Sequence, residues 1–406
     1  MYSKNNYTES FKLTKNKLGK GSFGSVYVGK TEKGFIAVKC EASDKKKEAL
    51  TLYKEYMICR TFYLITNYLG LTSSISSLKD KVSVFESNDD KESADNYKKK
   101  INKKENEVKN IVNSDEIKIF EYITQNNMLT IPNEMSIDFL LNYKCVPCIL
   151  KYVECENHNF LLMELCGDNL DNFLTKYKFT ERGKYFIAQH LLNTMSCIHR
   201  CGVVHRDIKM ANIVLNKKIE DDNTKDIYPI ILDMGLSKKY YKTNSNKFIK
   251  LAVKKNNDIV GTLRYISINI HEHNSPTIID DLISLSYVLV TIMTGNDLPW
   301  IGHKKDVGKF NPEQHKFNNC KCGYHKNVKN KCTKENNTIA EIKFHTPLET
   351  LTGKYTFLLK WIKYLYSLKP NQLPSYKYLY EELNKEINTY KKKNKVDELH
   401  FEYEQI

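Results

Sequence analysis

The sequence has no long hydrophobic run and no hydrophobic leader. No apolar stretch approaches the roughly 18 residues that a membrane-spanning helix requires, and the first residues, MYSKNNYTESFKLTK, are polar. No unit recurs at a fixed period, which argues against a repeat protein. We therefore expect no membrane segment, and a location in the cytoplasm, the nucleus or both.

A disulfide framework is also not expected. The 11 cysteines are odd in number and scattered along the chain. Without a secretory leader, this pattern favours a reducing compartment in which the thiols are free or bind a metal.

The chain carries an excess of positive charge and a sizeable apolar fraction. Lys and Arg number 63 against 48 Asp and Glu, which gives a net charge of +15. The excess favours acidic partners such as phosphates, nucleic acid or acidic protein segments, although lysine-rich loops that only confer solubility explain it equally well. A hydrophobic fraction of 41% suffices for a core, and 406 residues predict two packed units.

The two units differ in their pattern. Residues 11–40 alternate apolar and polar, which predicts antiparallel strands, and residues 44–64 have helical spacing. The stretch at about 72–127 is polar and highly charged, so we expect a flexible insertion there. Two more strands are predicted around the polar turn at 156–159.

From Cys166 onward the apolar spacing is mainly helical, and it includes the stretches DNLDNFLTKY, KYFIAQHLLNTMSCIHRCG and KYTFLLKWIKYLYSL. The predicted units are a β-rich region at 1–166 with the insertion at about 72–127, a larger helical region at 167–390 with a second polar insertion at about 303–345, and a charged tail at 391–406.

A glycine-rich stretch, LGKGSFGSV, opens the β-rich unit. Gly19, Gly21 and Gly24 fit the spacing G-x-G-x-x-G, in which backbone N–H groups can approach phosphate oxygens. A dinucleotide site would require a helix directly afterwards, whereas SVYVGKTEKGFIAVKC continues as strand, turn and strand. The pattern therefore favours a strand-turn-strand lid.

The strand IAVKC places Lys39 among apolar residues. A lysine on a buried face requires an opposite charge. A nucleotide phosphate is one candidate, and Glu55 in the following helix is another. The alternative is a lysine on an edge strand that points to water.

The stretch VVHRDIKMANIVL carries the strongest chemical signal. Asp207 could accept a hydroxyl proton, Lys209 could neutralise a transferring phosphoryl group, and Asn212 offers an amide oxygen to a metal. Further on, ILDMGLSKKY delivers Asp233 from a short hydrophobic run into a turn that contains Gly235, which indicates a metal or phosphate site.

In this order the motifs resemble those of the eukaryotic protein kinases, over most of the chain outside the insertions. The resemblance implies a bilobal α+β fold, with a small β-rich N-lobe carrying one main helix and a larger, mainly helical C-lobe. It implies ATP and Mg²⁺, with Asp207 as catalytic base, Lys209 at the γ-phosphate, and Asn212 and Asp233 as magnesium ligands. Lys209 is typical of the serine/threonine kinases. The residues implied to bind ATP are Leu18, Gly19, Gly21, Ser22, Gly24, Val26, Ala37, Lys39, Glu55, Met163, Glu164, Cys166 and Asp171.

Later motifs are similar to those of the casein-kinase-one group, which includes the vaccinia-related kinases. The usual Ala-Pro-Glu is replaced by GTLRYISINIH, followed by DDLISLSYVLVTIMTGNDLPW. The resemblance gives Thr262 and Asp281 contacts to the catalytic loop. It also implies protein substrates whose Ser or Thr lies near acidic or phosphorylated residues. The chain departs from the group in having Ile278 and Ile279 before the double aspartate, and Arg264 alone matches the basic substrate pocket.

A Cys/His-rich stretch interrupts the helical unit. HKFNNCKCGYHKNVKNKC brings Cys320, Cys322, His325 and Cys332 close together, and these could enclose zinc. The alternative is a solvated loop with incidental Cys and His, because Cys-x-Cys is less common at zinc sites than Cys-x-x-Cys.

Three functional classes follow from these observations. The first is an active serine/threonine kinase, expected as a monomer, in which Met234 replaces the usual phenylalanine as a packing residue. The second is a pseudokinase scaffold, from which the strand lysine or a key aspartate is typically missing. The third is a basic nucleic-acid-binding protein, which would require aromatic residues among the lysines at 98–109. Because every ionic part of a kinase is present, the sequence favours the first.

Overall fold

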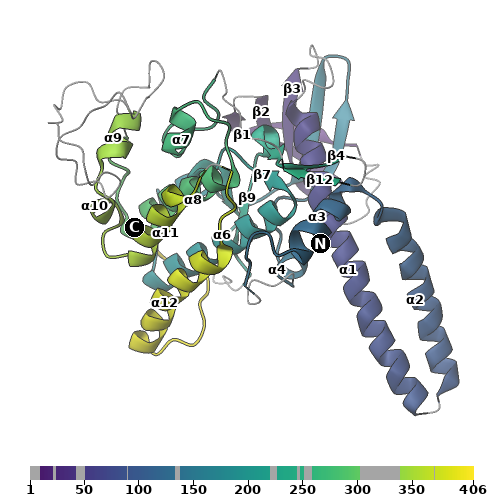
Figure 1. Ribbon diagram of the computed structural model, residues 1–406. Coiled ribbons are helices and arrows are strands. Elements are labelled where there is room, and N and C mark those ends of the chain that lie inside the picture. The colour runs from purple at the N-terminus through teal and green to yellow at the C-terminus, as the bar shows by residue number, and fades with distance from the viewer. Residues whose placement is uncertain are drawn as a thin grey trace.

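Two regions of different character meet in the computed structural model, a β-sheet region and a larger helical region (Figure 1). The architecture is the bilobal α+β fold that the sequence predicts. The structure describes residues 10–21, 24–42, 51–88, 90–132, 138–219, 226–244, 247–250, 258–301, 339–369 and 371–406.

A five-stranded antiparallel sheet forms the first region, in the order β1-β2-β3-β5-β4. Its register pairs Val26 with Lys39, and Ala37 with Met163. The alternating pattern at 11–40 is confirmed as three strands. The strands are β1 (Lys12–Gly21), β2 (Gly24–Thr31), β3 (Gly34–Ala42), β4 (Ile149–Glu154) and β5 (His158–Glu164).

The helix expected at 44–64 begins, in the described residues, at Thr51, and it does not stop at 64. Helix α1 (Thr51–Ser87) is continuous over its whole length. The chain then turns, and α2 (Lys91–Ile111) and α3 (Asp115–Gln125) follow. The later part of α1 and all of α2 form an antiparallel arm that projects from the body (Figure 1). The prediction of a flexible insertion at 72–127 is therefore wrong.

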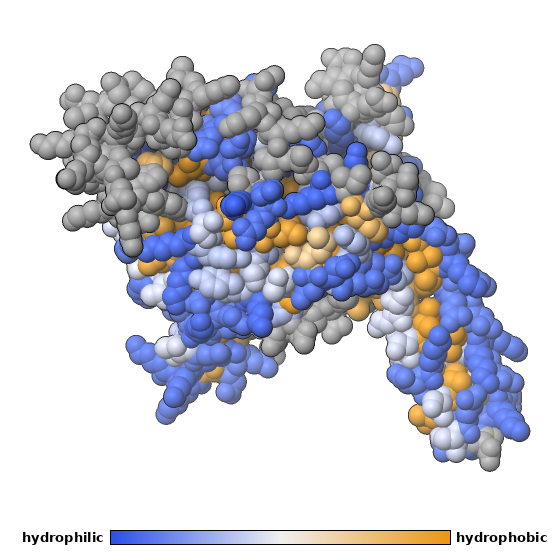
Figure 2. Space-filling view, viewed as in Figure 1, coloured by the Kyte–Doolittle hydropathy of each residue, from blue (hydrophilic) through white to orange (hydrophobic). Residues whose placement is uncertain are grey.

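The arm is held together by a narrow apolar seam. On α1 the seam contains Ile75, Leu78, Val82 and Phe85, whose spacings of three, four and three match a coiled-coil pattern. These side chains pack against the facing residues of α2, which are Ala94, Tyr97, Ile101 and Val108. Figure 2 shows the seam as an orange stripe with hydrophilic residues beside it. Because one stripe suffices for a two-helix hairpin, low overall apolar content did not preclude order.

The second region is built around α8 (Ile278–Thr294), which is buried over nearly its whole length. The helix begins with a capping box between Thr277 and Asp280, and it ends at Gly295, whose φ of 73° lies in the left-handed region. The helices around it are α4 (Asp138–Asn142), α5 (Leu170–Phe173), α6 (Glu181–Arg200), α7 (Ile268–His271), α9 (Ile339–His345), α10 (Leu348–Thr352), α11 (Thr356–Ser367) and α12 (Tyr376–Asn394).

Within the described ranges of the helical region, four two-stranded ladders complete the fold and position its loops. The strands pair as β7 (Val203–Val204) with β10 (Lys238–Lys239), β8 (Ile213–Leu215) with β9 (Pro229–Ile231), β11 (Tyr241–Asn244) with β12 (Lys247–Lys250), and β6 (Tyr177–Phe179) with β13 (Tyr403–Gln405).

One local prediction needs correction. The stretch DNLDNFLTKY forms only the short α5, which Asn169 caps at its N-terminus, before the chain turns into β6. The charged tail at 391–406 contains a strand that the sequence did not predict. Its strand β13 pairs with β6, and Phe401 is buried against Phe173 and Phe179.

No helix in the described ranges combines the length and the apolar character needed to cross a membrane.

Candidate active site

Lys39 joins the sheet, helix α1 and the turn after β9. Its Nζ lies 2.7 Å from Oε2 of Glu55 and 2.7 Å from Oδ1 of Asp233. Burial by itself lowers the pKa of Lys39, but the two carboxylates outweigh it and raise that pKa above its ordinary value. Burial likewise opposes ionisation of Asp233, yet Lys39 holds the Asp233 pKa below its usual value. At neutral pH Lys39 and Asp233 are therefore charged, whereas burial raises the pKa of Glu55. Lys39 does not point to water.

The turn after Asp233 needs glycine because α1 approaches it closely. A Cβ atom on Gly235 would lie 2.8 Å from Cγ2 of Thr51 and 3.0 Å from Oδ1 of Asp233. Met234 is buried beside this turn, and Ser237 donates a hydrogen bond to its sulfur across 3.2 Å. Met234 thus belongs to the main hydrophobic core, in a turn that α1 contacts.

Asp207 lies at the centre of a second polar cluster. Its Oδ1 accepts a hydrogen bond from Thr262 across 2.7 Å, and its Oδ2 lies 2.6 Å from Nζ of Lys209. Nζ of Lys209 also donates to Oγ1 of Thr262, at 3.1 Å. Lysine and threonine together fix the carboxylate, so that a hydroxyl could approach it from a defined direction.

Asp281 holds the backbone of this catalytic loop. Its carboxylate accepts hydrogen bonds from the backbone N–H groups of His205, at 2.6 Å, and Arg206, at 2.8 Å. Arg206 has a φ of 74°, a conformation that costs a non-glycine residue free energy and needs such support. His199 contacts the same carboxylate at 3.2 Å, and Tyr376 contacts the opposite nitrogen of that ring at 2.7 Å.

The donor set of Asn212 and Asp233 fits a magnesium ion. Nδ2 of Asn212 donates to the backbone oxygen of Asp207 across 2.9 Å, which leaves the amide oxygen for another partner. The backbone N–H of Leu232 donates to the carbonyl of Asn212 across 2.7 Å and so places Asp233 beside it. Hard oxygen ligands of this kind are the ones that Mg²⁺ prefers. Among the described residues, no group of three or more His, Cys, Asp or Glu forms a further metal site.

The glycine-rich stretch forms the hairpin of β1 and β2, as predicted, with Gly21 opposite Gly24. A Cβ atom on Gly24 would lie only 2.0 Å from the carbonyl oxygen of Cys40, so this position excludes any side chain. Gly19 has open space around it, as a phosphate-facing position requires. Ser22 lies outside the described residues.

Three of the apolar residues implied to bind ATP also lie together. Val26, Ala37 and Met163 belong to one hydrophobic cluster on the sheet. Leu18, on β1, is half exposed.

The segment after β5 is fixed by its own side chains. The carboxylate of Glu164 is bonded to Lys144 and accepts a hydrogen bond from the backbone N–H of Cys148 at 2.7 Å. Burial raises the pKa of the Cys166 thiol to about 12, so the thiol stays protonated at neutral pH. Asp171 is exposed at the surface, yet desolvation by its neighbours raises its pKa, while the positive charges of Arg264 and Lys209 oppose that shift. The side chain of Glu164 is therefore occupied by contacts within the protein.

The family model for the protein kinase domain matches residues 115–375, which is more than half of the chain. The chain belongs to the protein kinase family. The match begins at α3, and strands β1, β2 and β3, which precede it, supply Lys39 and the glycine hairpin of this kinase.

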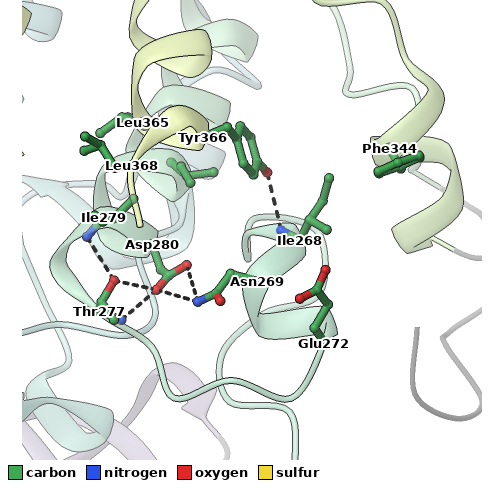
Figure 3. A pocket seen from close by; sticks show the side chains of 11 residues that line it. Ile268, Asn269, Glu272, Thr277, Ile279, Asp280, Phe344, Leu365, Tyr366 and Leu368 are labelled. Carbon is green, nitrogen blue, oxygen red and sulfur yellow. Dashed lines mark hydrogen bonds between the residues drawn. The ribbon is translucent and has the colours of Figure 1, made fainter. Parts of the chain in front are cut away.

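The kinase replaces the usual Ala-Pro-Glu with a different set of contacts between α7 and α8 (Figure 3). Asp280 accepts hydrogen bonds from Ser267, from Asn269 at 3.1 Å and from the backbone N–H of Thr277 at 2.7 Å. Tyr366 of α11 accepts a hydrogen bond from the backbone N–H of Ile268 at 3.4 Å. The chain after Thr262 is thereby anchored to the core helix.

Sequence reasoning identified the ionic parts of the site but missed several supporting residues. It assigned no role to His199 and Tyr376, which support Asp281, or to the ring of His205, whose Nε2 lies 2.9 Å from the carbonyl oxygen of Leu232. Lys343 was missed as well, although it is buried and donates to the carbonyl oxygens of Leu263 and Ile266 at 2.6 Å. A lysine within an apolar helical stripe was the available signal. The proposed zinc ligands Cys320, Cys322, His325 and Cys332 lie outside the described residues.

Proposed function

We propose that this kinase is active and transfers the γ-phosphoryl group of ATP to Ser or Thr hydroxyls of proteins. The observation that carries the proposal is the joint arrangement of Lys39, Glu55 and Asp233 on one side and Asp207, Lys209 and Thr262 on the other. A pseudokinase scaffold, the alternative, typically lacks at least one of these charges.

In the proposed reaction Asp207 accepts the proton of the substrate hydroxyl as that oxygen attacks. Lys209 offsets the negative charge of the phosphoryl group in transit, and Lys39 binds the phosphates that remain. Mg²⁺ held by Asn212 and Asp233 supplies further positive charge to the phosphate oxygens. Lys209 also supports a preference for Ser and Thr.

We further propose membership of the casein-kinase-one group, including the vaccinia-related kinases, and a preference for acidic or phosphorylated substrates. The Ser267-Ile268-Asn269 triplet bonded to Asp280 supports the group, and Arg264 supports the preference. The same proposal includes three further properties. The kinase is a monomer, it is located in the cytoplasm or nucleus, and its two lobes meet between Cys166 and Gly167. Phosphorylation of a peptide library with and without phosphorylated sites tests the preference.

Catalysis is tested with Asp207→Asn, because asparagine keeps the shape of aspartate and cannot accept the proton. We expect wild-type protein to phosphorylate casein or itself with ATP and Mg²⁺, and the variant to be slower by at least about 100-fold. Equal activity of the two proteins would refute the assignment. A wild-type protein that binds ATP but transfers nothing would instead support the scaffold.

A further inference from the structure

The segment between Asp233 and Thr262, here called the activation segment, contains the hairpin of β11 and β12. This hairpin lies against α3 of the insertion. The ring of Phe248 stacks on the ring of Tyr122 with centroids 4.0 Å apart and planes 11° apart. Tyr241 meets the edge of the same Tyr122 ring at 6.3 Å, so one side chain of α3 contacts both strands.

A second contact lies closer to Asp233. Nζ of Lys239, at the end of β10, lies 2.8 Å from Oε1 of Glu116 in the first turn of α3. Burial opposes ionisation of Glu116, yet Lys239 holds the Glu116 pKa below its usual value. The hydroxyl of Tyr241 also lies 3.6 Å from the sulfur of Met128, just beyond the end of α3.

Helix α3 is itself fixed to the body of the kinase. Ser114 caps its N-terminus, and its apolar face belongs to the main core through Ile117, Phe120 and Ile123. Its position therefore does not depend on the hairpin, and it can act as a fixed support for it.

We propose that α3 is a brace for the activation segment, with Tyr122 and Glu116 as positioning residues for protein-substrate binding. The segment begins at the magnesium ligand Asp233 and ends at Thr262, which bonds both Asp207 and Lys209. The contacts to α3 therefore hold the hairpin of a segment whose two ends both lie at the candidate active site. This inference rests on the proposed kinase function.

The brace predicts that its loss changes the KM for the protein substrate but not kcat or the KM for ATP. When the segment leaves its braced position, the fraction of molecules ready to bind a protein substrate falls, and the apparent KM for that substrate rises by the same factor. Saturating substrate restores the braced fraction, so kcat is retained. The bonds of Lys39 to Glu55 and Asp233 do not involve α3, so we expect the KM for ATP to stay unchanged.

The test compares Tyr122→Ala with Tyr122→Phe, which keeps the stacked ring. Tyr97→Ala is the matched control, because it removes a stacked ring of the arm, at 5.3 Å from Phe85, that does not touch the activation segment. We expect Tyr122→Ala to raise the peptide KM about three- to tenfold and to speed amide hydrogen exchange in β11 and β12. Tyr122→Phe and Tyr97→Ala should match wild type.

Two outcomes would overturn the brace. One is unchanged hydrogen exchange in β11 and β12 in a protein that carries both Tyr122→Ala and Glu116→Gln. The other is a uniform loss of kcat, ATP binding and melting temperature, which indicates a merely structural role. If wild-type protein transfers no phosphoryl group, the proposed function fails, and hydrogen exchange still decides whether α3 holds the hairpin.

Discussion

Lys39 bonds Asp233 directly, with 2.7 Å between Nζ and Oδ1, and so joins strand β3 to the start of the activation segment. The same ammonium group bonds Glu55, so a single side chain holds the sheet, α1 and the turn after β9 together. Its removal has consequences for both stability and nucleotide binding.

Lys39→Met should lower the free energy of unfolding by about 3 kcal/mol, because it leaves the buried carboxylate of Glu55 without its counter-charge. It should also abolish phosphoryl transfer and weaken ATP binding, as measured by calorimetry. Lys30→Met is the matched control, since Lys30 is exposed on the neighbouring strand β2. Equal ATP affinity in wild type and Lys39→Met would contradict the assigned role.

Gly24→Ala should disrupt the glycine hairpin. The new Cβ atom would lie 2.0 Å from the carbonyl oxygen of Cys40, and the φ of 155° disfavours a side chain as well. We expect a rise of about tenfold or more in the KM for ATP and a loss of about 1–3 kcal/mol in stability. Gly19→Ala is the control for stability, because nothing lies within 4 Å of its Cβ position. An unchanged melting temperature in Gly24→Ala would count against this geometry.

Asp281→Asn should release the catalytic loop. The amide would place an N–H₂ group where the carboxylate now accepts the backbone N–H of His205 or Arg206. The expected loss is about 2–4 kcal/mol in unfolding free energy, together with most of the transfer rate. Chemical denaturation and a kinase assay measure the two effects. The exposed Asp297, changed to Asn in the same helical region, should show neither effect.

His190 should make the protein sensitive to mild acid. Burial lowers its pKa from 6.5 to about 3, and its ring lies among Phe139, Tyr143 and Tyr228. The unfolded chain binds a proton below pH 6.5 that the folded chain refuses until about pH 3, so stability falls as pH falls through this window.

At pH 5 this difference amounts to about 2 kcal/mol, from about 1.4 kcal/mol for each pH unit. His190→Phe should flatten the dependence between pH 6.5 and pH 5 in denaturation curves. A variant with the same slope as wild type would show that other groups cause the acid sensitivity.

The ionic parts of the site could be predicted from sequence because each lies in a short motif of fixed spacing. Lys39, Asp207, Asn212 and Asp233 need only the order of strands and turns to come together. The bonds from Asp281 to His205 and Arg206 depend on how α8 passes beneath the loop. The family resemblance indicated that contact, whereas spacing alone did not.

The elements that sequence reasoning missed are those in which few apolar residues do the packing. Ile75, Leu78, Val82 and Phe85 are diluted among charged residues, and the composition concealed their coiled-coil spacing. Strand β13 was missed for a similar reason, because Phe401 and Tyr403 lie in a charged tail and find their partners more than 200 residues away, at β6.

Helix α1 carries Glu55 near one end and the tip of the arm at the other. At about 1.5 Å per residue, its 37 residues extend over about 55 Å. Its residues up to Leu69 pack into the core of the body, and the later part extends outward with α2 as the arm. A partner that binds the tip would tilt α1 about its contacts with the sheet. The tilt would move the carboxylate of Glu55, which bonds Lys39.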